Sequence, residues 1–186
     1  MLLAAIQRSQ LFLLLHTIDV EEANEAQAQP CSCGGRLHKA HYPRKPRGGP
    51  PGLPEAYCIR LGLCCDREGC RERVLPPSVL FWGRRVYWGV VLLVVTALRQ
   101  QRLEGFTAKR VRELFGIGRP TLNRWMRYFR EIFPRSRSWQ RVRGRVSPAV
   151  SDQELPSALL MVFLREHHSA EQALTRLLCL LNPSGP

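Results

Sequence analysis

Apolar residues recur at the spacing of α-helices over most of the chain, which predicts a mainly α-helical protein. Helices are expected within residues 1–30, over the apolar run 86–98 and in one or two closing segments after Leu155. Residues 31–75 differ, because short β-like runs alternate there with Gly and Pro residues that favour turns. The pattern therefore predicts a mainly α fold with a small β module.

Residues 108–127 carry the pattern of two short helices joined by a tight turn. Gly116 falls at the turn, where a positive φ angle is usual, while Thr107 can cap the first helix and Pro120 suits the first turn of the second. The apolar positions expected to face a shared core are Val111, Phe115, Ile117, Leu122 and Trp125. With the helix over 86–98, this pattern predicts a trihelical domain that contains a helix-turn-helix. An ordinary helical hairpin with a solvated basic face is the alternative.

The outward positions of the second helix carry side chains suited to reading DNA. In a helix-turn-helix this helix lies in the major groove of double-stranded DNA. Arginine can bond guanine through two hydrogen bonds, asparagine can do the same with adenine, and threonine can reach bases or phosphates. The candidate DNA-binding residues on this helix are Arg119, Thr121, Asn123, Arg124 and Arg127. The helix is expected to continue until Pro134 ends it.

Positive charge is concentrated around the same segment. The chain has a formal net charge of +13, and residues 99–145 contain 14 Lys or Arg residues against 3 acidic ones. Such a patch favours phosphate binding through counterion release, although RNA, an acidic protein or an anionic membrane would be attracted by the same charge. In the Arg-rich extension over 135–145, Arg137 and Arg141 are expected to contact DNA along its backbone. A solvated basic linker is the other interpretation of this extension.

Two close pairs of cysteines flank the β-like stretch, an arrangement typical of a zinc ribbon. Glycines accompany both pairs and favour the tight turns that aim backbone N–H groups at sulfur. Four thiolates would hold a structural zinc ion (Zn2+) and leave no position for water. The candidate ligands are Cys31, Cys33, Cys65 and Cys70, and the alternatives are Cys64, Cys58, His38 and His41. Free thiols in a loop are the alternative to a metal site.

Residues 42–52, between the cysteine pairs, are basic and rich in proline. Their Pro-Arg-Gly core is similar to that of a minor-groove AT-hook, but Gly49 stands where the second Arg of that motif is expected. A flexible insertion is therefore favoured over a true hook.

The cysteine content also bears on the compartment. Seven cysteines without a convincing secretory leader favour a reducing environment, so we expect a cytoplasmic, nucleoid-associated protein. The apolar run over 86–98 has 13 residues, whereas a bilayer span needs roughly 20. No membrane-spanning helix is expected.

The order of these motifs resembles bacterial transposase-related proteins of insertion sequences. The resemblance covers residues 31 to about 145 and rests on the runs CxCGG-RLH, YPRKPRGGP and CC-x4-GCRER-x2-PPSV-x-F-x-GRRVY, followed by the helix-turn-helix pattern. It implies a zinc ribbon and a helix-turn-helix that bind the terminal repeats of a mobile element. By that resemblance the ligand role falls on the four candidate cysteines, and the recognition role on Arg119, Asn123, Arg124 and Arg127.

The catalytic domain of that class, with three acidic residues that hold two metal ions, is not expected here. About 41 residues follow Arg145, and their acids are Asp152, Glu154, Glu166 and Glu171, too few for a nuclease fold of the usual size. We therefore predict a noncatalytic, sequence-specific DNA-binding protein that acts at transposon ends or in transcription regulation. A compact or truncated transposase that cuts or joins DNA is one alternative, and an RNA- or ribosome-binding zinc-ribbon protein is a second.

Four segments are expected along the chain. They are an N-terminal helical segment (1–30), a zinc-ribbon-like module (31–75), the trihelical DNA-binding domain (78–134) and a basic linker with C-terminal helices (135–186). The apolar terminal helices fit a homodimer interface, and packing within one core explains them equally well.

Overall fold

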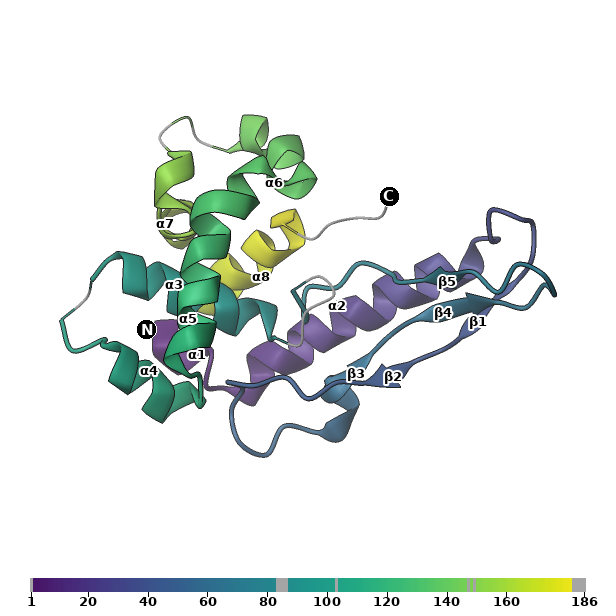
Figure 1. Ribbon diagram of the computed structural model, residues 1–186, viewed down its shortest axis with the longest axis horizontal. Coiled ribbons are helices and arrows are strands. Elements are labelled where there is room, and N and C mark those ends of the chain that lie inside the picture. Colours follow the sequence, from purple (N-terminus) through teal and green to yellow (C-terminus); the bar gives the residue numbers. More distant parts are fainter. Residues whose placement is uncertain (1, 83–86, 103, 147, 149, 182–186) are drawn as a thin grey trace.

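The computed structural model describes residues 2–82, 87–102, 104–146, 148 and 150–181. Most helices lie at one end of the molecule and an elongated β-ribbon lies at the other (Figure 1). The long helix α2 runs alongside the ribbon (Figure 1). The α-helices are α1 (Leu2–Ala5), α2 (Ser9–Ala28), α3 (Gly89–Gln100), α4 (Ala108–Phe115), α5 (Arg119–Arg127), α6 (Arg137–Val142), α7 (Ser157–Glu166) and α8 (Ala170–Leu181). The strands are β1 (Leu37–Lys39), β2 (Tyr42–Pro43), β3 (Ile59–Arg60), β4 (Leu63–Cys65) and β5 (Arg73–Val74). The prediction of a mainly helical protein with a small β module is confirmed.

The helices share one apolar core around α3. Residues 89–98 of α3 are all buried, as the apolar run over 86–98 predicts, and Val86 itself lies outside the described residues. Side chains from α2, α5, α7 and α8 belong to the same core. Because α8 contacts α1, α2 and α3, the first and last described helices close this core together.

Two short antiparallel ladders form the β-ribbon. In the first, β4 pairs with both β1 and β5, and Leu37 lies opposite Cys65. In the second, β2 pairs with β3, and Tyr42 lies opposite Arg60. The backbone N–H of Ala40 donates to the carbonyl oxygen of Gly62 (2.8 Å) between the two ladders. The ribbon therefore separates the cysteine-rich turns at one end from the loop after β2 at the other.

A buried carboxylate joins α2 to the segment before α3. Asp19 is 3% exposed and accepts hydrogen bonds from the Ser78 hydroxyl and from the backbone N–H groups of Val79 (2.7 Å) and Leu80 (3.3 Å). Burial raises the pKa of Asp19 to about 6, although these bonds and the nearby Arg60 of β3 act in the opposite direction. The Asp19 carboxylate thus accepts hydrogen bonds from one O–H and two N–H groups that would otherwise be buried without a partner.

The two short helices predicted over 108–127 are observed as α4 and α5. The side-chain oxygen of Thr107 accepts a hydrogen bond from the backbone N–H of Arg110 (3.2 Å) and so caps α4. Gly116 ends α4 in the left-handed conformation with a φ of 61°, and Pro120 lies in the first turn of α5. The five predicted core positions are at most 5% exposed; they are Val111, Phe115, Ile117, Leu122 and Trp125.

The segment after α5 stays helical up to Pro134, as predicted, but not as a regular α-helix. The helix changes after Arg127 into a π-helical turn, η2 (Tyr128–Ile132), and then into a short 3₁₀ turn, η3 (Phe133–Arg135). Pro134 has no N–H and its ring conflicts with the carbonyl four residues earlier, so a regular α-helix cannot pass through it. Phe129 and Phe133 are buried in this segment, whereas Ile132 is 52% exposed.

Part of the Arg-rich extension is helical and packed, so the interpretation as a solvated basic linker is wrong for that part. Its residues 137–142 form helix α6, which Ser136 caps by accepting from the backbone N–H of Trp139 (3.2 Å). Trp139 and Val142 are buried, and the indole N–H of Trp139 donates to Asp152 (2.6 Å). A cap and two apolar anchors hold this segment on the core in spite of its charge.

The proline-rich loop after β2 is packed rather than flexible, so that prediction is wrong too. Arg47 forms an isolated β-bridge with Tyr87, and Leu53 packs against the helical core. A Cβ on Gly48 would lie 3.0 Å from Val91, so the backbone passes very close to α3. These contacts join residues far apart in the sequence, and the local composition carries no sign of them.

Candidate metal centre and basic helical surface

Four cysteine sulfurs meet at one end of the β-ribbon. Cys31 and Cys33 precede β1, Cys65 ends β4, and Cys70 lies in the turn before β5. Their Sγ atoms all lie within 4.8 Å of one another. The Sγ atoms of Cys31 and Cys70 are 3.8 Å apart, and those of Cys33 and Cys65 are 3.5 Å apart. The structure thus brings together the four predicted ligands.

These distances fit a tetrahedral metal ion. A metal–sulfur bond of about 2.3 Å, as zinc forms, places four tetrahedral thiolates about 3.8 Å from one another. A disulfide would need sulfurs about 2.0 Å apart, and the cysteines are free. Among the residues that the structure describes, this quartet is the one grouping of three or more His, Cys, Asp or Glu side chains close enough to hold a metal ion.

Two backbone turns direct N–H groups at the sulfurs. The N–H of Gly35 donates to Sγ of Cys33, and the N–H of Arg67 donates to Sγ of Cys65, both at 3.4 Å. The N–H of Gly34 donates to the carbonyl oxygen of Cys31 at 2.7 Å, and the left-handed φ of 82° at Gly34, which favours glycine, turns the chain toward Gly35. Such donors disperse the negative charge of thiolates around a metal.

Gly35 also leaves room for a ligand. A Cβ at this position would lie 2.5 Å from Sγ of Cys65 and 3.0 Å from Cβ of Arg67. Both separations are shorter than an ordinary contact between such atoms, so a side chain here would displace the sulfur or the turn.

The thiols influence one another strongly. The N–H of Gly35, together with the neighbouring sulfurs, lowers the pKa of Cys33 to about 7. At Cys65 the N–H of Arg67 acts in the same direction, but burial and the other three sulfurs outweigh it and raise the pKa to about 12. Cys33 therefore loses its proton more readily than Cys65, and a cation between the sulfurs would favour the thiolate form.

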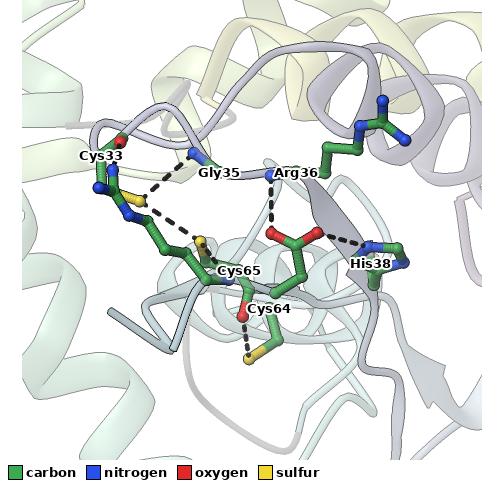
Figure 2. Close-up of polar contacts among 8 residues, drawn as sticks. Cys33, Gly35, Arg36, His38, Cys64 and Cys65 are labelled. Carbon is green, nitrogen blue, oxygen red and sulfur yellow. Dashed lines mark hydrogen bonds and ion pairs between the residues drawn. The ribbon is translucent and has the colours of Figure 1, made fainter. Parts of the chain in front are cut away.

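The other two candidate cysteines lie outside the quartet. Cys64 points away from the sulfurs of Cys33 and Cys65, and its thiol donates to the carbonyl oxygens of Cys65 and Arg71 at 3.6 Å (Figure 2). Successive side chains of a strand point to opposite faces, which explains why Cys65 rather than Cys64 joins the group. Cys58 lies in the short helix η1 (Glu55–Cys58) and packs against the helical core.

The two candidate histidines make other contacts. Nε2 of His38 lies 3.3 Å from a carboxylate oxygen of Asp66, whose other oxygen accepts from the backbone N–H of Arg36 at 2.9 Å (Figure 2). Nδ1 of His41 lies 3.1 Å from the carbonyl oxygen of Gly62. Neither histidine belongs to the metal-binding group.

Sequence reasoning missed the polar side chains that tie the two cysteine turns together. A carboxylate oxygen of Glu72 lies 3.5 Å from Sγ of Cys31 and accepts from the Ser32 hydroxyl at 2.9 Å. The guanidinium of Arg67 donates to the carbonyl oxygen of Cys33. The one sequence feature that pointed to these residues is that they lie close to the cysteines. Because charged residues are frequent in any turn, that feature does not single them out.

The second predicted site is the outward face of α5. Thr121 is half-buried and accepts from the guanidinium of Arg124 at 3.2 Å. Arg127 forms an ion pair of 2.7 Å with Glu131, and the hydrogen bond in that pair lowers the pKa of Glu131. The exposed candidates are Arg119, Asn123, Arg124 and Arg127. The structure therefore places all five predicted residues on one short helix whose opposite side is buried.

Arg137 and Arg141 are exposed on α6. Figure 1 shows α6 beyond the C-terminal end of α5, whereas α4 lies near the N-terminal end. The two arginines thus belong to a different helix from the five candidates on α5.

Comparison with models of protein families, with curated proteins and with solved structures finds no match to this chain. Within the described residues, no helix combines the length and apolar character needed to cross a bilayer. The cysteine quartet and the exposed surface of α5 are therefore the two features of the chain that bear on its function.

Proposed function

We propose that this protein binds double-stranded DNA sequence-specifically, with α4 and α5 as a helix-turn-helix and α5 as the helix that enters the major groove. The observation that carries the proposal is the two-sided character of α5. Leu122 and Trp125 anchor one side in the core, and polar, mostly cationic residues occupy the other. A recognition helix needs this combination, because a rigid scaffold must present the side chains that read base edges.

The exposed residues follow the geometry of one helical face. Arg119, Asn123 and Arg127 succeed one another at four-residue steps, and Arg124 follows Thr121 after three. Asparagine pairs with the major-groove edge of adenine, and arginine with that of guanine. We assign base reading to Asn123 and Arg124, and phosphate or base contacts to Arg119, Thr121 and Arg127.

We further propose that the quartet binds zinc in a structural role. Four thiolates complete a tetrahedral site, so no position remains for water or a substrate. The core beside the quartet is small and consists of Cys31, Leu37, Leu63 and Cys65 with a few partly buried neighbours. Zinc can contribute on the order of 10 kcal/mol to such a module, which apolar burial alone would barely stabilise.

The resemblance to transposase-related proteins points to a mobile-element end or an operator as the DNA target, bound without catalysis. Asp152, an acid that a DNA-cleaving enzyme of this class would have to use, accepts from the indole of Trp139 and lies 3.8 Å from the guanidinium of Arg143. These contacts support a structural role for this carboxylate.

Selection of bound sequences from a random duplex library tests the proposal. We expect a clear motif for the wild-type chain, with the preference at one base pair lost in Asn123→Ala at a cost of about 1–3 kcal/mol there. Arg137→Gln is the matched control; it should weaken binding to every sequence alike. Absence of enrichment, or equal effects of both variants on every sequence, would contradict base reading by α5.

Two further assays separate the alternatives. Tighter binding to structured RNA than to the selected duplex, in competition at physiological salt, would favour an RNA-binding protein. Nicking of supercoiled DNA with Mg2+ that is lost in Asp152→Asn or Glu154→Gln would establish a DNA-cleaving enzyme.

A further inference from the structure

A pocket lies between the proline-rich loop and the start of α5. Its volume is about 600 Å³. Its lining residues are Lys45 and Arg47 of the loop, Tyr87, residues 116–118 between α4 and α5, and Thr121 and Arg124 of α5. The loop thus reaches the helix assigned to DNA reading, although some 70 residues of sequence separate them.

Three cations converge on this pocket. Lys45, Arg47 and Arg124 are exposed, and none of them forms an ion pair with a carboxylate in the described part of the chain. No acidic side chain is found among the described residues that line the pocket. By contrast, other arginines of this region are paired: Arg127 with Glu131, and Arg110 with Glu113. Uncompensated positive charge therefore accumulates at the pocket.

The loop holds its cations on a fixed backbone. A Cβ on Gly49 would lie 2.5 Å from Nε1 of Trp88, and one on Gly48 would lie 3.2 Å from Ile117. Leu53, later in the same loop, packs against the helical core. Because the backbone is already placed, less conformational entropy is lost when Lys45 and Arg47 bind an anion.

We propose that this pocket binds a phosphate group of the nucleic-acid backbone, so that Lys45 and Arg47 extend the DNA-binding surface beyond the helix-turn-helix. The source of the phosphate rests on the function proposed for α5. A guanidinium binds two phosphate oxygens in parallel, an ammonium adds a point charge, and the Thr121 hydroxyl adds a donor. An anion also relieves the repulsion among three neighbouring cations. Contacts of this kind fix the position of a protein on the duplex without reading its sequence.

The test compares two double variants that lose the same charge. Lys45→Gln with Arg47→Gln removes two cations from the pocket, and Arg165→Gln with Arg176→Gln removes two exposed cations from α7 and α8. Binding of a labelled random-sequence duplex is measured by fluorescence anisotropy between about 50 and 200 mM salt. The pocket variant should bind about tenfold more weakly at low salt and reduce the slope of log affinity against log salt by about 2, one for each cation. The control should change neither quantity.

Equal behaviour of the two double variants would overturn the inference, provided that both keep the wild-type melting temperature. If the wild-type chain selects a DNA motif and the pocket variant binds duplex as tightly as the wild type, the phosphate-binding role of the pocket is overturned and the proposed function stands. A wild-type chain that binds no duplex would overturn the proposed function together with the backbone assignment. Titration of inorganic phosphate, followed by ³¹P NMR, identifies the source. One outcome is that the wild-type chain binds inorganic phosphate at micromolar concentration while the pocket variant loses this binding and keeps its duplex binding. That result would assign the pocket to a free phosphate compound and overturn the backbone assignment.

Discussion

The substitution Gly35→Ala is expected to weaken metal binding, because its Cβ would occupy the place of a ligand. That atom would lie 2.5 Å from Sγ of Cys65, roughly 1 Å inside the usual contact distance of about 3.5–4.0 Å. Cβ of Arg67 stands 3.0 Å away on the second cysteine turn and limits any retreat in that direction. Metal–sulfur bonds tolerate deviations of only about 0.2 Å, so Cys65 must leave its ideal position or the turn must shift.

Overpacking of this kind costs about 1–3 kcal/mol. In the metal-free protein the sulfur is free of bonding constraints and can move aside, so most of the strain falls on the metal-bound state. At 1.4 kcal/mol for each factor of ten, metal affinity should fall by roughly 5- to 150-fold. Competition with a chromophoric zinc chelator measures this change directly, and elemental analysis gives the metal content per chain.

Gly144→Ala is the matched control, because a Cβ there would meet no atom within 4 Å and its φ is not positive. It should bind zinc as the wild type does. Wild-type affinity in Gly35→Ala would refute the assignment of Cys65 to the coordination sphere. Zinc content near zero in wild-type protein purified without chelators would remove the metal site altogether.

Three more outcomes are expected. Cys33→Ser should lower the zinc content below one per chain, whereas Cys64→Ser should leave it unchanged, and elemental analysis decides; equal loss in both would contradict the quartet. Burial raises the pKa of Asp19 from 3.8 to about 6, so the native state keeps a proton that the unfolded chain has released. The free energy of unfolding should therefore fall by about 3 kcal/mol from this group as pH rises from about 3 to 7, and urea unfolding of Asp19→Asn should lack that part of the pH dependence. Thr107→Ala removes the oxygen that caps α4 at the N–H of Arg110 and should cost about 1 kcal/mol in urea unfolding; an unchanged midpoint would show that the cap contributes nothing.

Local signals account for the parts of the fold that the sequence predicts well. α4 and α5 are specified by Thr107, Gly116 and Pro120, each of which acts on its own turn, and by apolar residues at helical spacing. The cysteine quartet was predictable for a related reason, since β1 and β4 pair and bring the two cysteine turns together. The choice of Cys65 over Cys64 needed the strand to be known, because alternation along β4 decides which side chain faces the other cysteine sulfurs.

Contacts between distant residues account for the failures. The proline-rich loop has a composition typical of flexible segments, yet Gly48 and Gly49 let its backbone approach α3 closely. In the same way, the Arg-rich segment that forms α6 packs on the core because Trp139 is buried there and its indole N–H donates a hydrogen bond to Asp152. Asp19 is the third contact of this kind. Nothing near it in the sequence reveals that it accepts hydrogen bonds from the Ser78 hydroxyl and from backbone N–H groups about 60 residues later.

Helix α2 makes the two ends of the molecule one unit of folding. Leu11, Phe12 and Leu15 near its start lie in the helical core, and Ala26 near its end packs against the small core beside the cysteines. Its 20 residues span roughly 30 Å, so one continuous helix connects the two regions. Metal binding at the cysteine quartet is therefore expected to stabilise helices that the metal does not touch.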